Sequence, residues 1–180
     1  MRYRRIGALA LGGLAFLGAS CTSSRRDPVV NEPKPAPLLS CELQARAQVR
    51  SGEPVRVHFK LKNLAARPLF VLGWRTPIEG LFGNDWQVTR GGVAIAYQGP
   101  MVKRGEPEAE DYVTIAPGEA AEAEVEVSLA YEMRQPGRYV IALRGPLMDV
   151  TTAKAAVPRP LAQHQPMAVQ CSLLEVEVTP

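Results

Sequence analysis

Residues 121–129 have the sequence Ala-Glu-Ala-Glu-Val-Glu-Val-Ser-Leu, in which apolar and polar side chains alternate. Because successive side chains of a β-strand point to opposite faces, this pattern predicts a strand with one buried and one solvated face. Ala121 and Leu129 would both face inward. The same alternation recurs in residues 41–50 and in residues 55–62. The sequence therefore predicts several half-buried antiparallel strands.

A β-hairpin is predicted where residues 86–90 and residues 93–97 flank a Gly-Gly pair. A two-residue loop of glycines suits a type I′ turn, which requires positive φ at both positions. In that register Val88 lies opposite Ile95 and Trp86 lies opposite Tyr97, all on one face. Cross-strand pairs of β-branched and aromatic side chains stabilise a sheet by roughly 0.2–1 kcal/mol each, so the predicted pairing is specific.

The fold class follows from the remaining strand and turn signals. The segment Pro136-Gly-Arg-Tyr139 resembles the tyrosine corner of sandwich folds, in which a tyrosine hydroxyl bonds to the backbone just upstream. Residues 169–178 predict a closing strand whose inward phase shifts at Leu173, which indicates a bulge. No window has a helical period of useful length. The sequence predicts an all-β, immunoglobulin-like antiparallel β-sandwich of about seven to nine strands over residues 38–180.

Residues 1–20 have the composition of a bacterial export signal. Basic residues 1–5 precede an apolar stretch, residues 6–19, that is too short to span a membrane. The small residues before Cys21 resemble a bacterial lipoprotein processing site. Lipidation of Cys21 would place the chain in the cell envelope, on the outer membrane and facing the periplasm. The alternative is ordinary cleavage that leaves Cys21 with a free thiol. Residues 21–37 are rich in proline and predict an extended tether.

The two other cysteines, Cys41 and Cys171, lie in predicted strands near opposite ends of the folded region. An exported domain folds where disulfides form and persist. A bridge would tie the first strand to the last, and its long loop would contribute on the order of 4–5 kcal/mol by loop entropy. We expect this disulfide; the alternative is two separate buried thiols.

The charge balance argues against nucleic-acid binding. The chain has 21 Lys and Arg residues and 18 Asp and Glu residues, but the excess comes from Arg2, Arg4 and Arg5 in the export signal. Without the signal, basic and acidic residues are equal in number. Proteins that bind nucleic acid carry a basic excess that neutralises phosphates. We therefore expect no nucleic-acid partner.

The sequence contains none of the motifs that usually mark an enzyme. Two histidines cannot build a zinc site with a base, and no His-Glu-x-x-His, nucleophile elbow or phosphate-binding loop is present. Residues 106–111 could bind calcium and the glutamates of residues 122–126 could bind a metal, but neither has the ligand arrangement of a cage. We interpret both, and His58, as solvated. We expect a non-enzyme with no metal and no cofactor.

Residues 74–118 contain a distinctive series of short motifs. They are Trp74-Arg-Thr-Pro-Ile-Glu-Gly-Leu-Phe-Gly83, Val88-Thr-Arg90, Tyr97-Gln-Gly-Pro100, Val102-Lys-Arg-Gly105, Pro107, Asp111-Tyr-Val113 and Pro117-Gly118. The series resembles the N-terminal, propeptide-like region of bacterial deuterolysin-type (aspzincin) metallopeptidases, from about Cys41 to Leu143. The resemblance implies a β-sandwich, which in that family assists folding of the protease and holds the protease inactive. The zinc catalytic domain would begin where this chain stops, so no catalytic residue is carried over.

The resemblance implies a binding domain that acts in trans on a secreted metalloprotease, as a periplasmic inhibitor or folding partner. We expect contact through residues 99–112, a loop that should project from the sandwich because glycines and prolines flank it. The candidate contact residues are Met101, Val102, Lys103, Arg104 and Gly105. Lys103 or Arg104 could enter an active-site cleft. Trp74 and Trp86 either form a rival contact surface or lie in the core.

Two other functions are compatible with the sequence. A structural or assembly lipoprotein of the outer membrane would capture a strand of another envelope protein at an open sheet edge. A carrier of a metal or small ligand is disfavoured by the shortage of ligand residues. Inhibition of a protease separates the first function from the second, and stabilisation by a metal ion would reveal the third.

Overall fold

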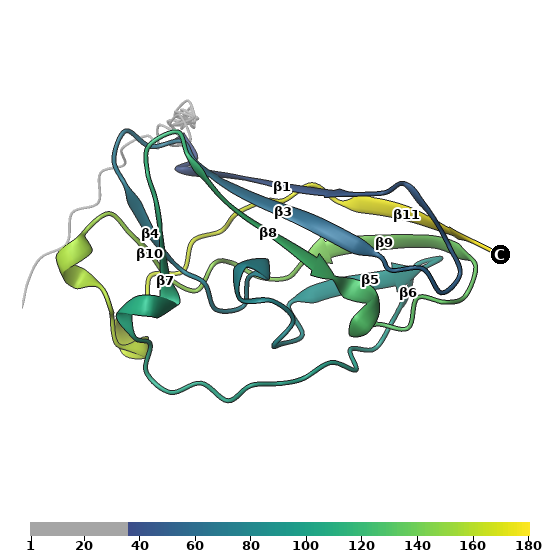
Figure 1. Cartoon of the computed structure of the whole chain (residues 1–180). Helices are drawn as coiled ribbons and strands as arrows, with labels where there is room; N and C mark the ends of the chain where they lie inside the picture. Colours follow the sequence, from purple (N-terminus) through teal and green to yellow (C-terminus); the bar gives the residue numbers. More distant parts are fainter. Residues whose placement is uncertain (1–35) are drawn as a thin grey trace, which may run out of the picture. The chain divides into compact units, whose positions relative to one another are not determined.

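The computed structural model describes residues 36–180, which form one compact unit of three sheets. The first sheet has the order β1 (Leu39–Ala45), β3 (Arg56–Asn63), β8 (Ala120–Glu126). The second has the order β2 (Gln48–Arg50), β11 (Leu174–Thr179), β9 (Gly137–Leu143), β5 (Trp86–Arg90), β6 (Val93–Ala94). The third has the order β10 (Val150–Thr151), β4 (Leu69–Leu72), β7 (Tyr112–Ile115). Figure 1 shows the first two sheets as facing layers and the third at one end.

These sheets confirm the predicted all-β sandwich. Every pair of neighbouring strands is antiparallel except β2 with β11. The described residues contain eleven strands rather than seven to nine, because three of them are short pieces of two or three residues. Short 3-10 helices complete this part of the chain, and they are η1 (Pro77–Glu79), η2 (Ala109–Asp111), η3 (Val127–Leu129), η4 (Lys154–Ala156) and η5 (Leu161–Gln163).

The hydrophobic core lies between the first two sheets. Val57, Phe59 and Leu61 of β3 are completely buried, as the alternation in the sequence predicts. They belong to one cluster with buried side chains of the second sheet, which are Val49, Trp86, Val88, Tyr139, Ile141, Val176 and Val178. Full burial of one such side chain stabilises the folded state by about 1.5–3 kcal/mol. The same cluster contains Leu69, Val71 and Ile115 of the third sheet, so one core shared by all three sheets stabilises the fold.

The strand predicted at residues 41–50 is in fact two strands. β1 pairs with β3 in the first sheet, whereas β2 pairs in parallel with β11 in the second sheet. The chain crosses between the sheets at Arg46 and Ala47, so Ala47 is exposed rather than inward-facing. The alternation continues through the crossing, and for this reason the sequence pattern does not reveal it.

The strand predicted at residues 121–129 is also shorter than expected. β8 ends at Glu126, and the chain then forms η3, where the Ala130 N–H donates to the Val127 carbonyl at 3.0 Å. This turn directs the side chain of Leu129 away from the core. Leu129 is 74% exposed, so the prediction that it faces inward is wrong.

The predicted hairpin between β5 and β6 is confirmed. Gly91 and Gly92 have φ values of 54° and 82°, the positive values that a type I′ turn requires. The Ile95 N–H donates to the Val88 carbonyl at 2.8 Å, which is the predicted pairing. β6 covers only Val93–Ala94, so the second arm of the hairpin is shorter than residues 93–97. The predicted pairing of Trp86 with Tyr97 is wrong, because Tyr97 bridges Tyr131 instead.

The C-terminal part of the domain contains the predicted tyrosine corner. Tyr139 is completely buried, and its hydroxyl donates to the Gln135 carbonyl at 2.8 Å. The closing strand begins later than predicted, at Leu174 instead of residue 169. Leu173 is 69% exposed while Val176 is buried. The predicted change of phase is present, but it is a break before the strand rather than a bulge within it.

The predicted disulfide between Cys41 and Cys171 is confirmed, with a Cα–Cα distance of 4.5 Å. It joins β1 to the segment that precedes β11, across 130 residues of sequence. The next residue, Ser172, strengthens the same junction. Its hydroxyl oxygen accepts from the Leu43 N–H at 3.1 Å and donates to the Leu43 carbonyl at 3.3 Å. This segment therefore occupies the outer edge of β1.

Asn63 holds together the two turns that join the first sheet to the third. Its side chain is completely buried. Nδ2 donates to the carbonyls of Arg67 and Ile115, each at 2.9 Å, and Oδ1 accepts from the Ala65 N–H at 2.8 Å. The Asn63 carbonyl also accepts from the Gly118 N–H at 3.1 Å. One amide thus satisfies backbone groups of both turns.

Replacing Asn63 with alanine is expected to lower the free energy of unfolding by about 2–4 kcal/mol, because buried backbone groups lose their partners. Urea unfolding followed by tryptophan fluorescence measures this change. The adjacent, exposed Lys62 provides the matched control, and Lys62→Ala should change stability by less than about 0.5 kcal/mol. Equal effects of the two substitutions would contradict the role given to Asn63.

The predicted export signal (residues 1–20), lipidation site (Cys21) and most of the tether (residues 21–37) lie outside the described residues. They therefore stay predictions.

Candidate functional site

An apolar hollow lies on the surface beside η1. Two adjoining cavities of about 310 and 400 Å³ form it, and we call it the Trp74 pocket. Both cavities are lined by Trp74, Glu79, Phe82, Val102 and Arg104. Concave, mostly apolar surfaces with a few polar groups are typical of binding sites.

Exposed apolar side chains surround this pocket. Met101 is 75% exposed, Phe82 and Val102 are 46% exposed, and Leu161 is 42% exposed. We call these four residues the apolar rim. Single exposed apolar residues are normal on a protein surface, but a group of them around one hollow indicates a surface that contacts another molecule.

The floor of the pocket is a small second core. Trp74 packs with Phe70, Leu72 and Tyr112, all less than 9% exposed. The indole N–H of Trp74 donates to Oδ1 of Asp111 at 2.9 Å. The indole is therefore fixed in position by packing and by a hydrogen bond, and the pocket has a rigid base.

The backbone next to Trp74 is held in a sparsely populated conformation. Arg75 has φ of 58° and is the one non-glycine residue with positive φ in the described part of the chain. Its N–H donates to Oε1 of Glu79 at 2.6 Å, and its Nε donates to Oδ1 of Asp85 at 2.9 Å. Such strain, about 1–3 kcal/mol, persists only where surrounding contacts impose it, and it is frequent at binding sites.

Arg104 closes one side of the pocket. Its guanidinium carbon lies 5.1 Å from the centroid of the Trp74 ring, a cation–π contact, and it forms an ion pair with Glu79. Burial raises the pKa of Glu79 above 4.5, and the hydrogen bond from Arg75 and the charge of Arg104 oppose this rise. Arg104 thus serves as part of the pocket wall.

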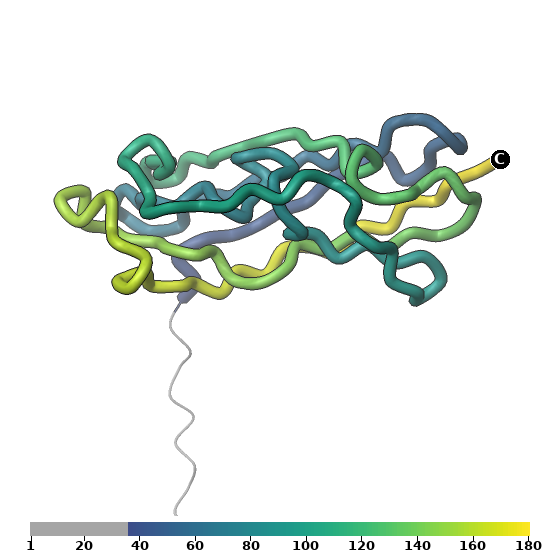
Figure 2. Tube along the Cα trace, turned by 90° about the horizontal axis from the view of Figure 1, so that it is seen from below, coloured from purple at the N-terminus to yellow at the C-terminus, as the bar shows by residue number. Residues whose placement is uncertain are grey.

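The loop at residues 99–112 does not project as predicted. It runs from the end of the sandwich that holds β6 to the end that holds β7 (Figures 1 and 2). The Val102 N–H donates to the Phe82 carbonyl at 3.1 Å, and Oε2 of Glu106 accepts from the Leu161 N–H at 2.7 Å. Hydrogen bonds at both ends and the Arg104 contacts therefore hold this loop against the domain.

The predicted contact residues divide into two groups. All five residues are exposed, but Arg104 also packs against the Trp74 ring. The prediction that Lys103 or Arg104 enters the cleft of a partner stays a prediction, and Arg104 would have to leave Trp74 and Glu79 to do so. Trp74 and Trp86 are 5% and 1% exposed, so both pack in the interior, and Trp74 also lines the Trp74 pocket.

A buried charge cluster lies in the loop at residues 146–168. Asp149 is completely buried and Arg159 is 9% exposed. The Arg159 guanidinium donates to both carboxylate oxygens of Asp149, at 2.9 and 2.7 Å. Oδ2 also accepts from the Tyr112 hydroxyl at 2.7 Å, and Oδ1 accepts from the Gln165 N–H at 2.8 Å. The cluster joins the loop to Tyr112, which is part of the pocket floor.

The protonation states of this cluster follow from its hydrogen bonds. Burial acts to raise the pKa of Asp149, but the bonds donated by Gln165, Tyr112 and Arg159 outweigh it and hold that pKa below 3.8. Burial and the bond to Asp149 raise the pKa of Tyr112 to about 12. The hydroxyl of Tyr112 therefore keeps its proton and stays a donor to the ionised carboxylate.

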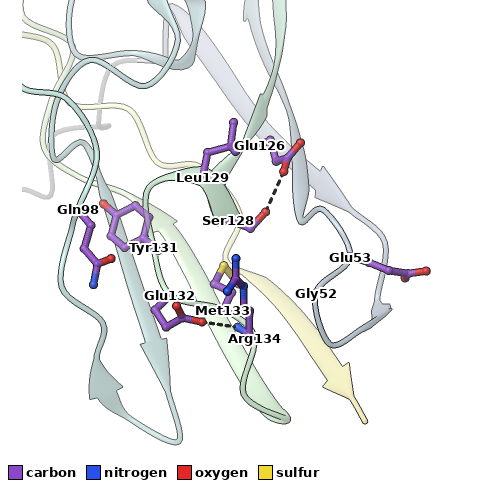
Figure 3. A pocket seen from close by; sticks show the side chains of 10 residues that line it. All are labelled: Gly52, Glu53, Gln98, Glu126, Ser128, Leu129, Tyr131, Glu132, Met133 and Arg134. Atoms are coloured by element: carbon purple, nitrogen blue, oxygen red, sulfur yellow. Dashed lines mark hydrogen bonds between the residues drawn. The ribbon is translucent and has the colours of Figure 1, made fainter.

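A separate cavity of about 270 Å³ lies beside η3 and has polar walls (Figure 3). Its serine, Ser128, accepts from the Val55 N–H at 3.0 Å and donates to the carboxylate of Glu126 at 3.3 Å. Glu132 accepts from the Arg134 N–H at 3.0 Å. No histidine is among the described residues that line this cavity. Ser128 therefore has a carboxylate but no imidazole beside it, unlike the serine–histidine pair of a typical nucleophilic serine.

The described residues hold no cluster of three His, Cys, Asp or Glu side chains that could bind a metal ion. His58 lies 3.5 Å from the carboxylate of Glu122 on the outer face of the first sheet, and His164 contacts the Arg159 carbonyl. The glutamates of β8 lie opposite the basic residues of β3, which agrees with a solvated strand face. Within residues 36–180, no helix is long and apolar enough to cross a membrane.

Comparison with known proteins reveals a relation to a protease. No model of a protein family matches the sequence. A curated protein of Aeromonas hydrophila called "Extracellular protease" is 32% identical over 112 residues, which cover 59% of this chain and 31% of that protein. The chain therefore spans less than a third of the length of this relative. This similarity bears out the expected relation to a protease. It does not identify that protease as one of the deuterolysin type.

Two solved structures are similar to the domain only in general outline. The CARDB domain of a Pyrococcus furiosus protein, in complex with di-metal ions, is 16% identical with a TM-score of 0.33, over 78% of this chain and 92% of that chain. The alkylpurine DNA glycosylase AlkC of Pseudomonas fluorescens is 12% identical with a TM-score of 0.34, over 81% and 32%. The fold assignment rests on the strand pairing described above.

Phe82 and Leu161 of the apolar rim were not among the residues predicted from the sequence. Phe82 lies within the motif of residues 74–83, and its exposure depends on the turn after η1, where Gly80 has φ of 94°. Leu161 lies in a proline-rich loop that carries no periodic pattern. Only the fold brings these two residues next to Met101 and Val102.

Proposed function

We propose that this chain is a non-catalytic lipoprotein of the bacterial cell envelope whose sandwich binds a secreted protease. The proposed partner is a deuterolysin-type metalloprotease, and the domain acts as its inhibitor or folding partner. The similarity to part of an extracellular protease supports this proposal most directly. A domain related to one part of a protease can recognise the rest of such an enzyme when supplied as a separate chain.

The Trp74 pocket supports the proposal with a suitable contact surface. The apolar rim offers exposed area that a partner would bury, and the floor of Trp74 is rigid, so little entropy is lost on binding. Lys103, next to the rim, could reach into the active-site cleft of the enzyme. Residues at the centre of such an interface contribute most of the binding energy.

The proposal is tested by titrating residues 36–180, the compact unit, against the Aeromonas extracellular protease and against a deuterolysin-type metalloprotease. We expect a saturable loss of peptide cleavage, with the domain itself left uncut. Replacing both Met101 and Val102 with serine should weaken inhibition about tenfold or more, because each truncated contact at an interface centre costs on the order of 1–2 kcal/mol. Lys103→Ala tests the cleft contact separately.

The matched control is Leu173→Ser, because Leu173 is as exposed as the rim residues and lies outside the pocket. Its inhibition constant should equal that of the unmodified domain. Full protease activity at saturating domain concentration would rule out the inhibitor role. A faster or larger recovery of activity when the protease refolds with the domain would then favour the folding-partner role.

A second candidate function is favoured by one specific observation. The outer edge of β8 has no neighbouring strand within the described residues. An assembly or structural lipoprotein of the outer membrane could bind another envelope protein at such an edge.

A further inference from the structure

β8 has a free hydrogen-bonding side. In an antiparallel pair, residues that exchange hydrogen bonds alternate with residues whose N–H and C=O groups point away from the partner strand. At one end of the ladder between β3 and β8, the Val127 N–H donates to the Val55 carbonyl; at the other end, the Asn63 N–H donates to the Glu119 carbonyl. Both bonds involve odd-numbered residues on the β8 side, so the even-numbered residues direct their backbone groups outward.

The residues of β8 with outward backbone groups are Ala120, Glu122, Glu124 and Glu126. In the described part of the chain β8 pairs only with β3, so these groups have no strand beside them. The opposite edge of the same sheet differs, because Ser172 bonds to both backbone groups of Leu43. The sheet is therefore covered at β1, whereas at β8 it has no strand on its outer edge and η1 packs nearby.

An apolar groove accompanies this open edge. A cavity of about 370 Å³ lies between β8 and the chain at residues 80–82, and Pro100, Leu129 and Ala130 complete its lining. Leu129 is 74% exposed and Phe82 is 46% exposed. Proteins usually protect open edges with charge or with a covering loop. Large exposed apolar side chains next to an open edge are instead the arrangement that a strand-binding site needs.

The charges on β8 define which strand could bind. Oε1 of Glu122 lies 2.9 Å from Nζ of Lys60, and Oε1 of Glu124 lies 4.0 Å from Nη1 of Arg56. Both basic residues belong to β3. An added strand would lie about 4.8 Å away on the other side, where cross-strand neighbours interact. A second copy of this chain, pairing β8 with β8, would place glutamate beside glutamate, which is unfavourable. Basic side chains would instead continue the alternation of charge across the sheet.

We propose that the edge of β8 binds an extended segment of another protein as a fourth strand. Lysine or arginine at alternate positions of this segment lies beside Glu122 and Glu124, and the intervening apolar side chains enter the groove between Phe82 and Leu129. This inference rests on the second candidate function and deepens it by naming the site and the chemistry of the partner. It does not depend on binding of a protease.

A fluorescent peptide, Lys-Val-Lys-Val-Lys-Val-Lys, provides the probe, and fluorescence anisotropy with residues 36–180 measures its binding. We expect saturable binding that weakens as salt is raised, since exposed ion pairs are screened. Two control peptides are compared. One has the same composition but its lysines and valines in separate blocks, so as a strand it does not place lysine on one face and valine on the other. The second alternates Glu with Val and so has the opposite charge. Neither should bind. Equal binding of the block peptide would overturn the proposal.

Glu124→Pro tests the backbone contact itself. Proline removes the outward N–H, and it spares the β3 ladder because that N–H does not bond to β3. Glu124→Thr is the matched control, since it removes the same charge and keeps the N–H. We expect at least a tenfold weaker affinity for the proline variant than for the threonine variant, about 1.4 kcal/mol or more. Equal affinities of the two variants would overturn the proposal.

Protease inhibition by the same variants separates the two functions. Intact inhibition by Glu124→Pro, together with lost peptide binding, supports a β8 site distinct from the Trp74 pocket. If the peptide does not bind to the unmodified domain, the strand-binding site is rejected whatever the protease titration gives. Circular dichroism and thermal unfolding of each variant confirm that it is folded. Leu129→Ser provides a second variant on the groove side, because Leu129 lines the groove and lies outside the Trp74 pocket.

Discussion

Replacing Asp149 with alanine should lower the free energy of unfolding by about 3–5 kcal/mol, the cost typical of removing one partner from a buried ion pair. The Arg159 guanidinium is 9% exposed and would lose both of its carboxylate contacts. The Tyr112 hydroxyl and the Gln165 N–H would lose their acceptor as well. Urea unfolding followed by the fluorescence of the buried tryptophans measures the loss.

Two control variants make this prediction specific. Combining Asp149→Ala with Arg159→Met should recover much of the lost stability, because an apolar pair leaves no buried charge without a partner. Glu175→Ala breaks an exposed ion pair with Arg138, whose side chains are 55% and 64% exposed, and should change stability by less than about 1 kcal/mol. If Asp149→Ala costs no more than Glu175→Ala, the cluster does not stabilise the loop.

The same cluster predicts a dependence of stability on pH. The folded-state pKa of Asp149 is lower than 3.8, its value in an unfolded chain. The stability that this carboxylate provides is therefore fully present above pH 3.8 and is lost as the pH falls through the lower folded value. The Asp149→Asn variant has no such carboxylate, so its stability should fall less steeply below that pH. Unfolding titrations at a series of acidic pH values compare the two proteins.

The sequence predicts those parts of the fold that depend on local pattern and chain stereochemistry. β3 is predicted because alternation over eight residues is incompatible with a helical face. The turn at Gly91 and Gly92 is predicted because few residues adopt positive φ twice in succession. Tyr139 is predicted because the bond from its hydroxyl reaches a carbonyl only four residues upstream. In each case the cause lies within a few residues of the effect.

The features that sequence analysis missed depend on residues far apart in the chain. Arg104 was expected in a projecting loop, but its position is set by Trp74, 30 residues earlier, and by Glu79. The sheet change at Ala47 depends on which strand lies nearby, because the alternation of side chains is the same in either sheet. The burial of Asp149 and Arg159 was hidden in a segment whose prolines and charges are typical of a solvated loop.

The disulfide gives the second large expected effect. Replacing both Cys41 and Cys171 with serine should lower the free energy of unfolding by about 4–5 kcal/mol if the full loop entropy is realised. The loss should be about 2–4 kcal/mol if the bridge stabilises the domain as much as a typical disulfide does. The reason lies in the unfolded state, because the bridge joins residues 130 positions apart and restricts the whole unfolded domain. Urea unfolding of the variant and of the oxidised protein measures the difference.

The dependence on urea concentration tests this origin of the effect. An unfolded chain without the bridge is more expanded and exposes more surface, so the slope of the unfolding free energy against urea should be steeper in the variant. Ser172→Ala is the matched control at the same junction. It removes the two hydrogen bonds to Leu43 and leaves the bridge intact, so it should cost about 1 kcal/mol with an unchanged slope. If the double-serine variant instead loses stability with no change in slope, the bridge acts mainly on the folded state, by holding β1 against the segment that leads into β11.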